Sequence, residues 1–320
     1  MTRYTAHRLL LLLPVLVGIS VVVFLLIHLI PGDVVDVLLG IQTSPEAAAA
    51  LRRIYGLDQP LHVQFTSWVS SLVRGDLGLS LRTGLPVSYI LGSRLVVTAE
   101  LAGLGLLLAC VVGIPLGVTA AFRQNTAVDY VASSAALIGL SMPDFWTGTL
   151  LVLVFSITVR WLPPTGYVPF STDPVANLKL MILPAITLAG ASASYIMRMT
   201  RSAVLEILSQ DYIRTARAKG LRKRQITYVH AFRNALVPVM AVVGQQMAYL
   251  LGGVVVVESI FGIPGLGRTA LDSIYYRDYP VVMGVVLFVA LSYVVINVLV
   301  DLLSALVDVR IRERIVSAKE

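Results

Sequence analysis

The 320-residue sequence predicts an all-α membrane protein with six transmembrane helices. Hydrophobic residues make up 57% of the chain and charged residues only 13%, and the mean hydropathy is +0.83. Soluble proteins carry roughly a quarter charged residues, so lipid is the expected solvent for most of this chain. The hydrophobic residues also fall into six separate runs, each close to the ~20 residues that a helix needs to cross a bilayer.

The first transmembrane helix is predicted at residues 9–30, where a long apolar run follows Arg3 and Arg8. This run is too long for the hydrophobic region of a signal peptide, and no small-residue cleavage site follows it. We therefore expect a retained membrane anchor. A polar segment at residues 31–95 separates this helix from the next apolar run.

Five further transmembrane helices are predicted downstream. Pro115, Pro143 and Pro184 lie inside apolar runs, and a proline inside a membrane span predicts a bend that faces the helix bundle, because neighbours must satisfy the freed carbonyl. The five helices are expected at residues 96–122, 135–159, 180–200, 237–258 and 281–303, with a polar loop at residues 201–236.

The distribution of basic residues predicts the orientation, because lysine and arginine favour the cytoplasmic side of a bilayer. With a cytoplasmic N-terminus, residues 1–8, the loop 201–236 and the tail 308–320 share one side and hold most of the 25 Lys and Arg residues. The segment 31–95 balances its basic residues with acidic ones, and a loop of this length hardly influences orientation. Both termini are therefore expected in the cytoplasm, and residues 31–95 outside it.

The cytoplasmic loop contains the run DYIRTARAKGLRKRQITYVHAFRNALVP, from Asp211 to Pro238. Asp211 suits a helix N-cap and Gly220 suits the left-handed position after a helix end. The run thus predicts a two-turn helix ending at Gly220, ~12 Å long and too short to be stable without a surface to lie on. The alternative is that its charges only set topology or contact anionic lipid, and this is the favoured interpretation of Arg222–Arg224.

Four motifs in this chain resemble those of one protein family. DYIRTARAKGL, followed by HAFRNALVP, is similar to the cytoplasmic EAA-type loop of bacterial ABC importer permeases, in the form found in the dipeptide, oligopeptide and nickel branch. The wider family has an acidic residue that is missing here, where Arg214 and Thr215 precede Ala216. The outer segments SPEAAAALRRIYGLDQPLHVQF with RGDLGLSLRTGLPVSYIL, WLPPTGY, and ESIFGIPGLGRTALDSIYYRDYPVV also resemble that branch, in the family's order.

The resemblance implies a type I ABC importer permease fold at residues 96–307 and a coupling helix that docks on a separate ATPase. His230, Arg233 and Asn234 either brace this helix or are ordinary interfacial residues. The residues expected to couple to the ATPase are Asp211, Ile213, Ala216, Arg217, Ala218, Lys219, Gly220 and Leu221.

The resemblance also implies partners. These are a second homologous permease, two ATP-binding cassette subunits and an extracytoplasmic substrate-binding protein, assembled in the bilayer of a bacterial cytoplasmic membrane. Di- or oligopeptides are the expected cargo, with nickel chelates, glutathione-like and sugar-linked solutes left open. No role in nucleic-acid binding is expected.

Several motifs are absent from the sequence. No G-x-x-x-x-G-K-[ST] occurs, so ATP and Mg are expected to be used by partner subunits. No H-E-x-x-H, G-x-S-x-G or C-x-x-C occurs, and Cys110 is the only cysteine. No catalytic residue, cofactor or metal is therefore expected in this chain. A secondary transporter that works without ATPase partners and a polytopic membrane enzyme are the alternatives from other classes.

Polar residues within apolar runs are candidates for the translocation path, because they are costly in a membrane. Asp144, Gln245 and Asn297 are the candidates. The alternatives are a position near the membrane surface for Asp144, if its helix starts later, and helix-joining hydrogen bonds for the two amides. Glu258 and Asp301 are interpreted as interfacial residues.

The segment FGIPGLG, residues 261–267, predicts a tight outer loop. An exposed hydrophobic loop usually marks an interaction surface. With residues 31–95 it is expected to receive the binding protein, and the candidate docking residues are Phe261, Gly262, Pro264 and Gly265.

Overall fold

The computed structural model describes residues 14, 17–25, 35, 45–54, 56–221, 225–226 and 232–307. The predicted N-terminal segment 1–8 and the tail 308–320 lie outside these residues, as does much of the predicted helix 9–30. Within them, regular structure is helical apart from one isolated antiparallel bridge, Leu79 to Pro86. The predicted all-α class is confirmed for the part of the chain that is described.

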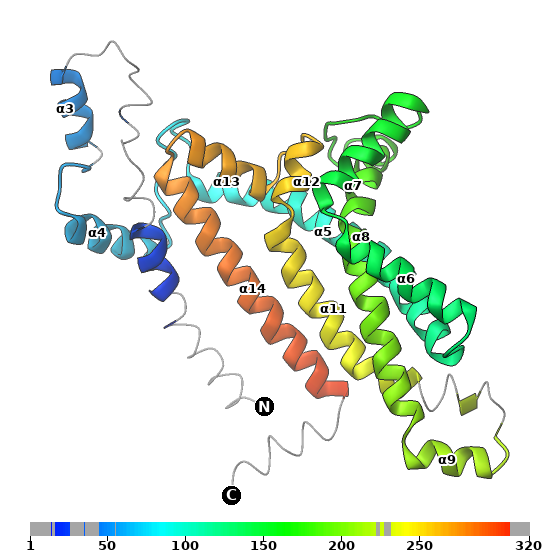
Figure 1. Cartoon of the computed structure of the whole chain (residues 1–320). Coiled ribbons are helices and arrows are strands. Elements are labelled where there is room, and N and C mark those ends of the chain that lie inside the picture. Colours follow the sequence, from blue (N-terminus) through cyan, green and yellow to red (C-terminus); the bar gives the residue numbers. More distant parts are fainter. Residues whose placement is uncertain are drawn as a thin grey trace, which may run out of the picture. The chain divides into compact units, whose positions relative to one another are not determined.

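The named helices follow one another along the chain (Figure 1). They are α3 (Pro45–Ile54), α4 (Leu61–Val73), α5 (Val87–Phe122), α6 (Ala127–Ser141), α7 (Asp144–Leu151), the π-helix η1 (Val152–Thr158), α8 (Pro174–Leu208), α9 (Asp211–Ala218), α11 (Arg233–Gly253), α12 (Val255–Ile260), α13 (Leu266–Tyr275) and α14 (Tyr279–Val307).

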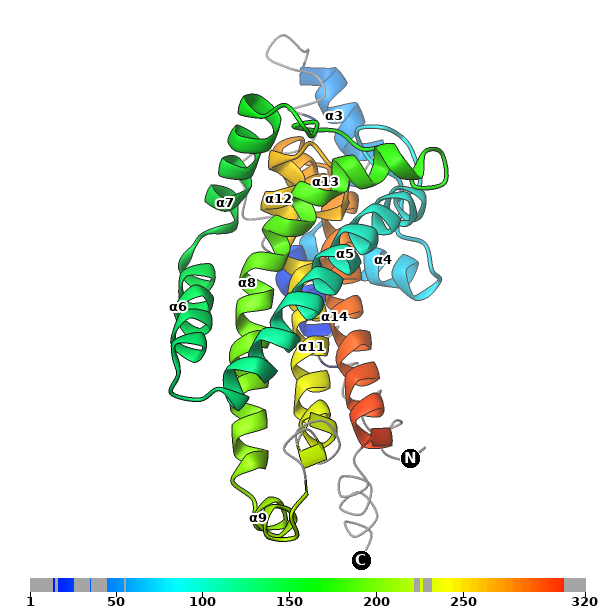
Figure 2. The same ribbon diagram turned by 90° about the vertical axis from the view of Figure 1, so that its right-hand side faces the viewer.

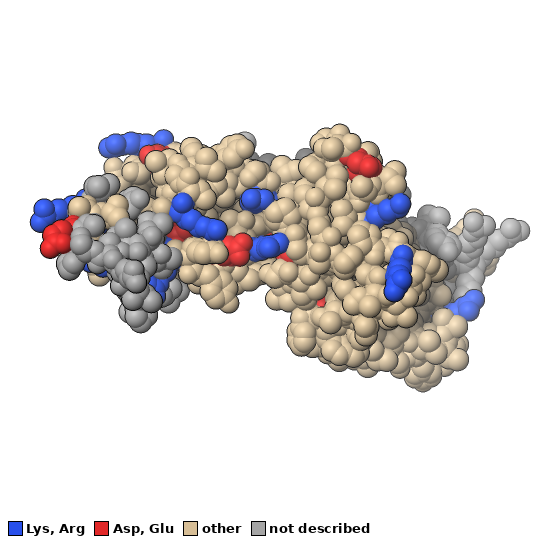
Figure 3. Space-filling view, turned by 90° about the horizontal axis from the view of Figure 1, so that it is seen from above, with Lys and Arg blue, Asp and Glu red and all other residues tan. Residues whose placement is uncertain are grey.

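Four of these helices are long and apolar enough to cross a membrane, within α5, α8, α11 and α14. A fifth candidate is the pair Ala127–Ser141 and Asp144–Thr158, which is bent by 100° at its break. The described residues therefore contain four or five candidate spans. Uncharged residues also dominate the face of the molecule seen in Figure 3, with Lys, Arg, Asp and Glu scattered over it.

The prediction of one helix at residues 135–159 is wrong. The helix starts earlier, at Ala127, and stops before Met142 and Pro143, whose ψ angles of 122° and 140° are extended. Proline lacks an N–H and disfavours helical backbone in the residue before it, so the chain breaks here rather than bending. Figure 2 shows α6 and α7 as separate segments.

The predicted spans 96–122, 180–200, 237–258 and 281–303 are confirmed as helical, but their ends differ. Polar residues that flank the apolar runs continue the helices, so α5 begins before residue 96 and α8 extends to Leu208. The predicted cytoplasmic loop 201–236 is correspondingly shorter. The predicted helix 237–258 is divided between α11 and α12, which meet at Val254.

The described residues form two compact units, and α5 and α14 contribute to both. The first contains Thr98–Ile263 and the part of α14 from Ser292. Within this unit, α8 packs against α6, α7, α11 and α12. Its first turn is fixed by Asp173, whose side chain accepts hydrogen bonds from the backbone amides of Val175 and Ala176.

The backbones of α5 and α8 approach closely within the first unit. A Cβ atom added at Gly113 would lie 2.6 Å from the carbonyl oxygen of Ala193, and one at Gly117 would lie 2.5 Å from that of Met197. The two glycines form a G-x-x-x-G pattern, which allows such contact between membrane helices. Glycine is therefore required at both positions for this packing.

Gly117→Ala is expected to destabilise the chain by about 1–3 kcal/mol, the usual cost of overpacking. Its matched control is Gly103→Ala on the same helix, where an added Cβ meets no atom within 4 Å. The control should be neutral or stabilising by up to about 1 kcal/mol, because alanine favours helix. Thermal unfolding in detergent measures both, and equal midpoints for the two variants would contradict the close contact.

The second unit contains the described residues up to Val97 together with Pro264–Leu291. Its hydrophobic clusters join α14 to α4 and to helical residues 17–25, and join α14 to α5 and α13. Asp278, 3% exposed, accepts hydrogen bonds from the Ser80 hydroxyl and from the backbone amide of Leu81 at 3.0 Å. These bonds hold the loop before α5 against the start of α14.

Candidate functional site

The two-turn helix predicted in the loop 201–236 is confirmed as α9. Gly220 has a φ of 76°, as the predicted left-handed position requires. The amide of Leu221 donates to the carbonyl of Ala216 at 3.3 Å, which is the closing bond of a Schellman motif. Asp211 is the first helical residue rather than the N-cap. Gln210 stands at the N-cap position, and its carbonyl oxygen accepts hydrogen bonds from the backbone amides of Ile213 and Arg214.

One face of α9 is packed against the rest of this chain. Ile213 is 0% exposed and Ala216 is 7% exposed, and both belong to a cluster with Ile226. Leu208, at the end of α8, and Leu221 pack against the same cluster. Ile213, Ala216 and Leu221, which were expected to couple to the ATPase, therefore anchor the helix within the chain.

The opposite face of α9 is exposed. Of the predicted coupling residues, Asp211, Ala218, Lys219 and Gly220 are exposed, and the side chain of Arg217 lies outside the described residues. Arg214 and Thr215 are exposed on the same helix, although sequence reasoning noted them only as departures from the family pattern. Helical spacing could have found them, since residues three and four apart share a face.

A second contact joins α9 to the first turn of α11. The side-chain amide of Asn234 donates to the hydroxyl of Tyr212 at 3.0 Å, so the expected brace by Asn234 is confirmed. Figures 1 and 2 both show α9 turned across the end of α8. His230, residues 222–224 and the side chain of Arg233 lie outside the described residues.

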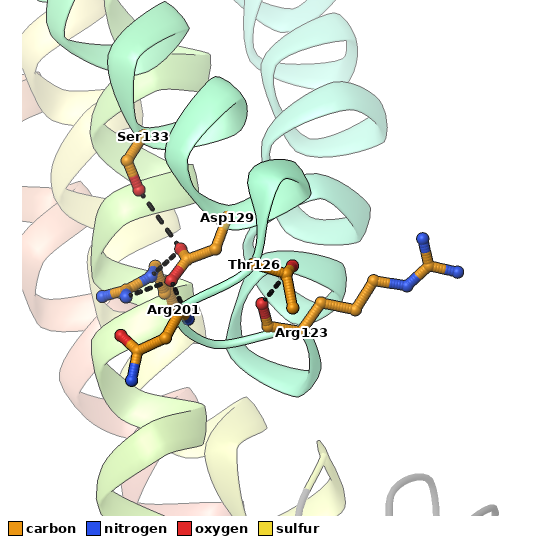
Figure 4. A network of polar contacts seen from close by, with 6 residues as sticks. Arg123, Thr126, Asp129, Ser133 and Arg201 are labelled. Atoms are coloured by element: carbon orange, nitrogen blue, oxygen red, sulfur yellow. Dashed lines mark hydrogen bonds and ion pairs between the residues drawn. The ribbon is translucent and has the colours of Figure 1, made fainter.

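A buried ion pair joins α6 to α8 near the end that carries α9 (Figure 4). The Arg201 guanidinium donates to both oxygens of Asp129, from Nε at 2.6 Å and from Nη2 at 2.8 Å. Asp129 is 2% exposed, whereas the Arg201 side chain is 26% exposed. The Asp129 carboxylate also accepts from the backbone amide of Asn125 at 3.0 Å and from the Ser133 hydroxyl at 3.4 Å.

The two hydrogen bonds fix both the distance between the Arg201 and Asp129 side chains and their relative orientation. A guanidinium that binds both oxygens of a carboxylate is held in the plane of that carboxylate. Arg201 lies ~10 Å before the end of α8 at 1.5 Å per residue. The pair therefore links α6 to the part of α8 that precedes α9. Sequence reasoning missed the pair, because its partners are far apart in the chain and neither stands in a recognisable motif.

Two of the predicted outer motifs meet in the first unit. The backbone amide of Gly166, in WLPPTGY, donates to the carbonyl of Phe261 at 2.9 Å. The Tyr167 hydroxyl donates to Oε2 of Glu100 at 2.9 Å. Burial, then the hydrogen bond to Glu100 and its negative charge, raise the pKa of Tyr167 to about 12. The raised pKa keeps the Tyr167 hydroxyl protonated in the range above pH 10, where an ordinary tyrosine ionises.

Glu258, interpreted from the sequence as an interfacial residue, is buried within the chain. Glu258 is 0% exposed, and Oε1 of its carboxylate accepts a hydrogen bond from the Thr98 hydroxyl at 2.6 Å. Burying a carboxylate is costly unless hydrogen bonds compensate. Glu258 thus ties α12 to α5 inside the chain. The side chain of Asp301 lies outside the described residues.

The expectation that the outer loop exposes its hydrophobic residues is also wrong in part. Phe261 is 2% exposed and Gly265 is buried, whereas Gly262 and Pro264 are partly exposed. Phe261 fills space beside α7, where its ring would lie 3.2 Å from a Cβ added at Gly148. Of the four predicted docking residues, only Gly262 and Pro264 offer surface.

The three predicted path residues lie on different helices. Asp144 is the first residue of α7 and partly buried, where a helix N-terminus favours a carboxylate. The helix α7 begins at Asp144, later than the predicted start at residue 135, which is the condition for the surface explanation of Asp144. Gln245, on α11, is exposed, and Asn297, on α14, donates to the carbonyl of Tyr293 in its own helix at 2.8 Å.

Two family models match this chain. Residues 113–313 match the model described as binding-protein-dependent transport system inner membrane component. Residues 1–101 match the N-terminal model for membrane components of binding-protein-dependent transport systems. The second match extends over the predicted first span and the segment that follows it.

Several curated proteins are similar to the chain over nearly its whole length. A putative peptide transport system permease protein of Brucella abortus is 44% identical over 98% of this chain and 99% of its own length. The dipeptide transport system permease protein DppB of Alkalihalophilus pseudofirmus is 41% identical over 98% and 100%. The glutathione transport system permease protein GsiC of Salmonella choleraesuis is 40% identical over 98% and 99%.

A solved structure resembles the fold. A chain of the MetNI methionine ABC transporter, in an inward facing conformation, aligns with a TM-score of 0.58 and 20% identity. The alignment covers 69% of this chain and 97% of that chain. The likeness indicates an importer permease fold for the aligned part.

Proposed function

Since the chain belongs to the family of binding-protein-dependent transport system inner membrane components, we propose that it is the permease subunit of an ATP-driven importer of di- or oligopeptides. The observation that carries the cargo class is the full-length similarity, at 40–44% identity, to permeases named for peptide and dipeptide transport. The relative named for glutathione transport favours a glutathione-like solute, itself a tripeptide, as the second candidate.

The permease works with partners in this proposal. The family description implies a binding protein, and an ATPase supplies the energy. A second homologous permease forms the pathway with this chain, and two ATP-binding cassette subunits use ATP and Mg. The remaining cargo alternatives are nickel chelates and sugar-linked solutes.

The proposed topology has six spans in a bacterial inner membrane with both termini in the cytoplasm. Residues 9–30 form the first span, residues 31–95 lie on the outer side, and residues 96–307 form the transport domain. The candidate spans in α5, α8, α11 and α14, with the broken pair α6 and α7, support the remaining five.

The exposed face of α9 is the proposed contact with the ATPase. The buried face of α9, formed by Ile213 and Ala216, supports this role. Because α9 is packed against its own chain, a movement of the ATPase would displace α9 and α8 together. The ion pair between Asp129 and Arg201 then couples the displacement of α8 to α6.

Reconstitution of the full complex into proteoliposomes tests the function. We expect ATP-dependent uptake of a labelled dipeptide in the presence of the binding protein, with little uptake of nickel. Vesicles that lack the ATPase subunits serve as the control. Uptake that persists in this control would indicate a secondary transporter, and preferential uptake of nickel would contradict the peptide assignment.

A further inference from the structure

The helices α3 and α4 differ in charge, although both lie in the segment predicted to be outside the membrane. The ten residues of α3 include Glu46, Arg52 and Arg53. The 13 residues of α4, LHVQFTSWVSSLV, include no Asp, Glu, Lys or Arg. A helix that faces water normally carries charged residues on its outer side. The composition of α4 therefore departs from that of a water-exposed helix.

The inner side of α4 packs at the end of a membrane span within the second unit. Phe65 and Trp68 contact the cluster of Val23, Phe24, Tyr279, Val282 and Met283. The ring of Phe24 lies 5.2 Å from that of Phe65, edge-on, and 6.2 Å from that of Trp68, stacked. The candidate span of α14 begins at Tyr279, so α4 is held at the level of its first turns. In Figure 1, α4 runs across this end of α14 and not along it.

Exposed apolar side chains lie near both ends of α4. Leu61 is 49% exposed, Val63 is 39% exposed and Val73 is 82% exposed. These residues flank hydroxyl side chains in the middle of the helix. The described residues of this unit leave these three side chains exposed, and in water they would add apolar surface.

Two polar side chains of α4 are satisfied without water. The Thr66 hydroxyl donates to the carbonyls of His62 at 2.9 Å and Val63 at 3.1 Å, within the helix. The side-chain amide of Gln64 donates to the carbonyl of Gln59 at 2.7 Å. A hydroxyl bonded to its own helix does not require solvent, as is common in membrane helices.

We infer that α4 lies in the membrane interface, with Leu61, Val63 and Val73 in contact with the lipid. Its position at a span end and its exposed apolar side chains favour an interfacial location, and the absence of Asp, Glu, Lys and Arg removes the charges that would make contact with lipid costly. Trp68, at this level, is a residue typical of the interface. The segment 31–95 is then divided: α3 remains in water, while α4 is a membrane-bound strap that links the first and last spans.

Spin labels at single cysteines test this inference in the assembled transporter. The background is Cys110→Ala, which removes the only cysteine of the chain. Labels are placed at Val63→Cys and Val73→Cys on α4, and at Ala49→Cys on α3, an exposed residue of the charged helix. The transporter is reconstituted into nanodiscs of phosphatidylcholine and phosphatidylglycerol, and collision rates with oxygen and with a water-soluble nickel chelate are measured.

Oxygen concentrates in lipid and the nickel chelate in water, so the ratio of their collision rates reports the surroundings of each label. We expect this ratio to be several-fold higher at both α4 positions than at Ala49→Cys, with ATP-driven uptake retained in all three variants. A ratio at α4 equal to that on α3 would overturn the inference in favour of water. Low collision rates with both reagents at α4 would overturn it in favour of a covering protein subunit.

Discussion

Replacing Gly220 with tryptophan is expected to abolish coupled transport while the chain remains inserted in the membrane. The φ of 76° at Gly220 lies in the left-handed region, where an L-residue with a Cβ costs about 1–2 kcal/mol. This strain acts on the turn that places Leu221 against Ala216. The bulky side chain would also stand on the surface proposed to meet the ATPase.

A Cβ added at Gly220 meets no atom within 4 Å, so a small side chain has room at this position. Gly220→Asn is the matched control, since asparagine adopts the left-handed conformation with less strain. ATP-driven uptake in proteoliposomes, normalised to the amount of inserted permease, measures both variants. Normal uptake by the tryptophan variant would rule out a docking role for this end of α9.

Replacing Asp129 with asparagine is expected to destabilise the chain and to uncouple transport from ATP hydrolysis. The change leaves the Arg201 guanidinium partly buried without its counter-ion. The expected loss is about 3 kcal/mol, the lower end of the range for a broken buried pair, because the Arg201 side chain is 26% exposed. Packing alone would then hold α6 to α8, so uptake should fall further than ATPase activity does.

Two measurements separate coupling from stability: the thermal unfolding midpoint and the number of substrates imported per ATP hydrolysed. The double variant Asp129→Arg with Arg201→Asp restores opposite charges and should recover part of both quantities. Arg268→Gln, which breaks an exposed 4.0 Å pair with Asp272, is the control and should change neither. An unchanged import ratio in Asp129→Asn would show that the pair only stabilises the fold.

The spans were predictable because apolar runs of helical length have few alternatives in a membrane, but their ends and breaks depend on tertiary structure. Pro115 and Pro184 lie inside continuous helices, whereas Pro143 stands at a complete break. The three prolines look alike in the sequence. Extended backbone at both Met142 and Pro143 distinguishes the third, and no local pattern in the sequence revealed it.

In the candidate site, too, local features could be predicted from the sequence, whereas contacts between helices could not. The position and ends of α9 followed from Asp211 and Gly220 to within one residue, because helix capping is local. The pairing of Asp129 with Arg201 and the burial of Glu258 were not predictable, since each depends on a partner from another helix. The hydrophobicity of Phe261 suggested an outer surface, but it reflects packing beside α7.

The contact of α5 with α8 through Gly113 and Gly117 limits how the permease can move. Where side chains lie between two helices, they can change rotamer and allow the helices to slide slightly. At Gly113 and Gly117 the two backbones are in direct contact, so no side chain can adjust in this way. These parts of α5 and α8 should therefore turn together as one stiff lever. The break between α6 and α7 interrupts the helical hydrogen bonds at Met142 and Pro143, so bending there costs less than bending within a continuous helix.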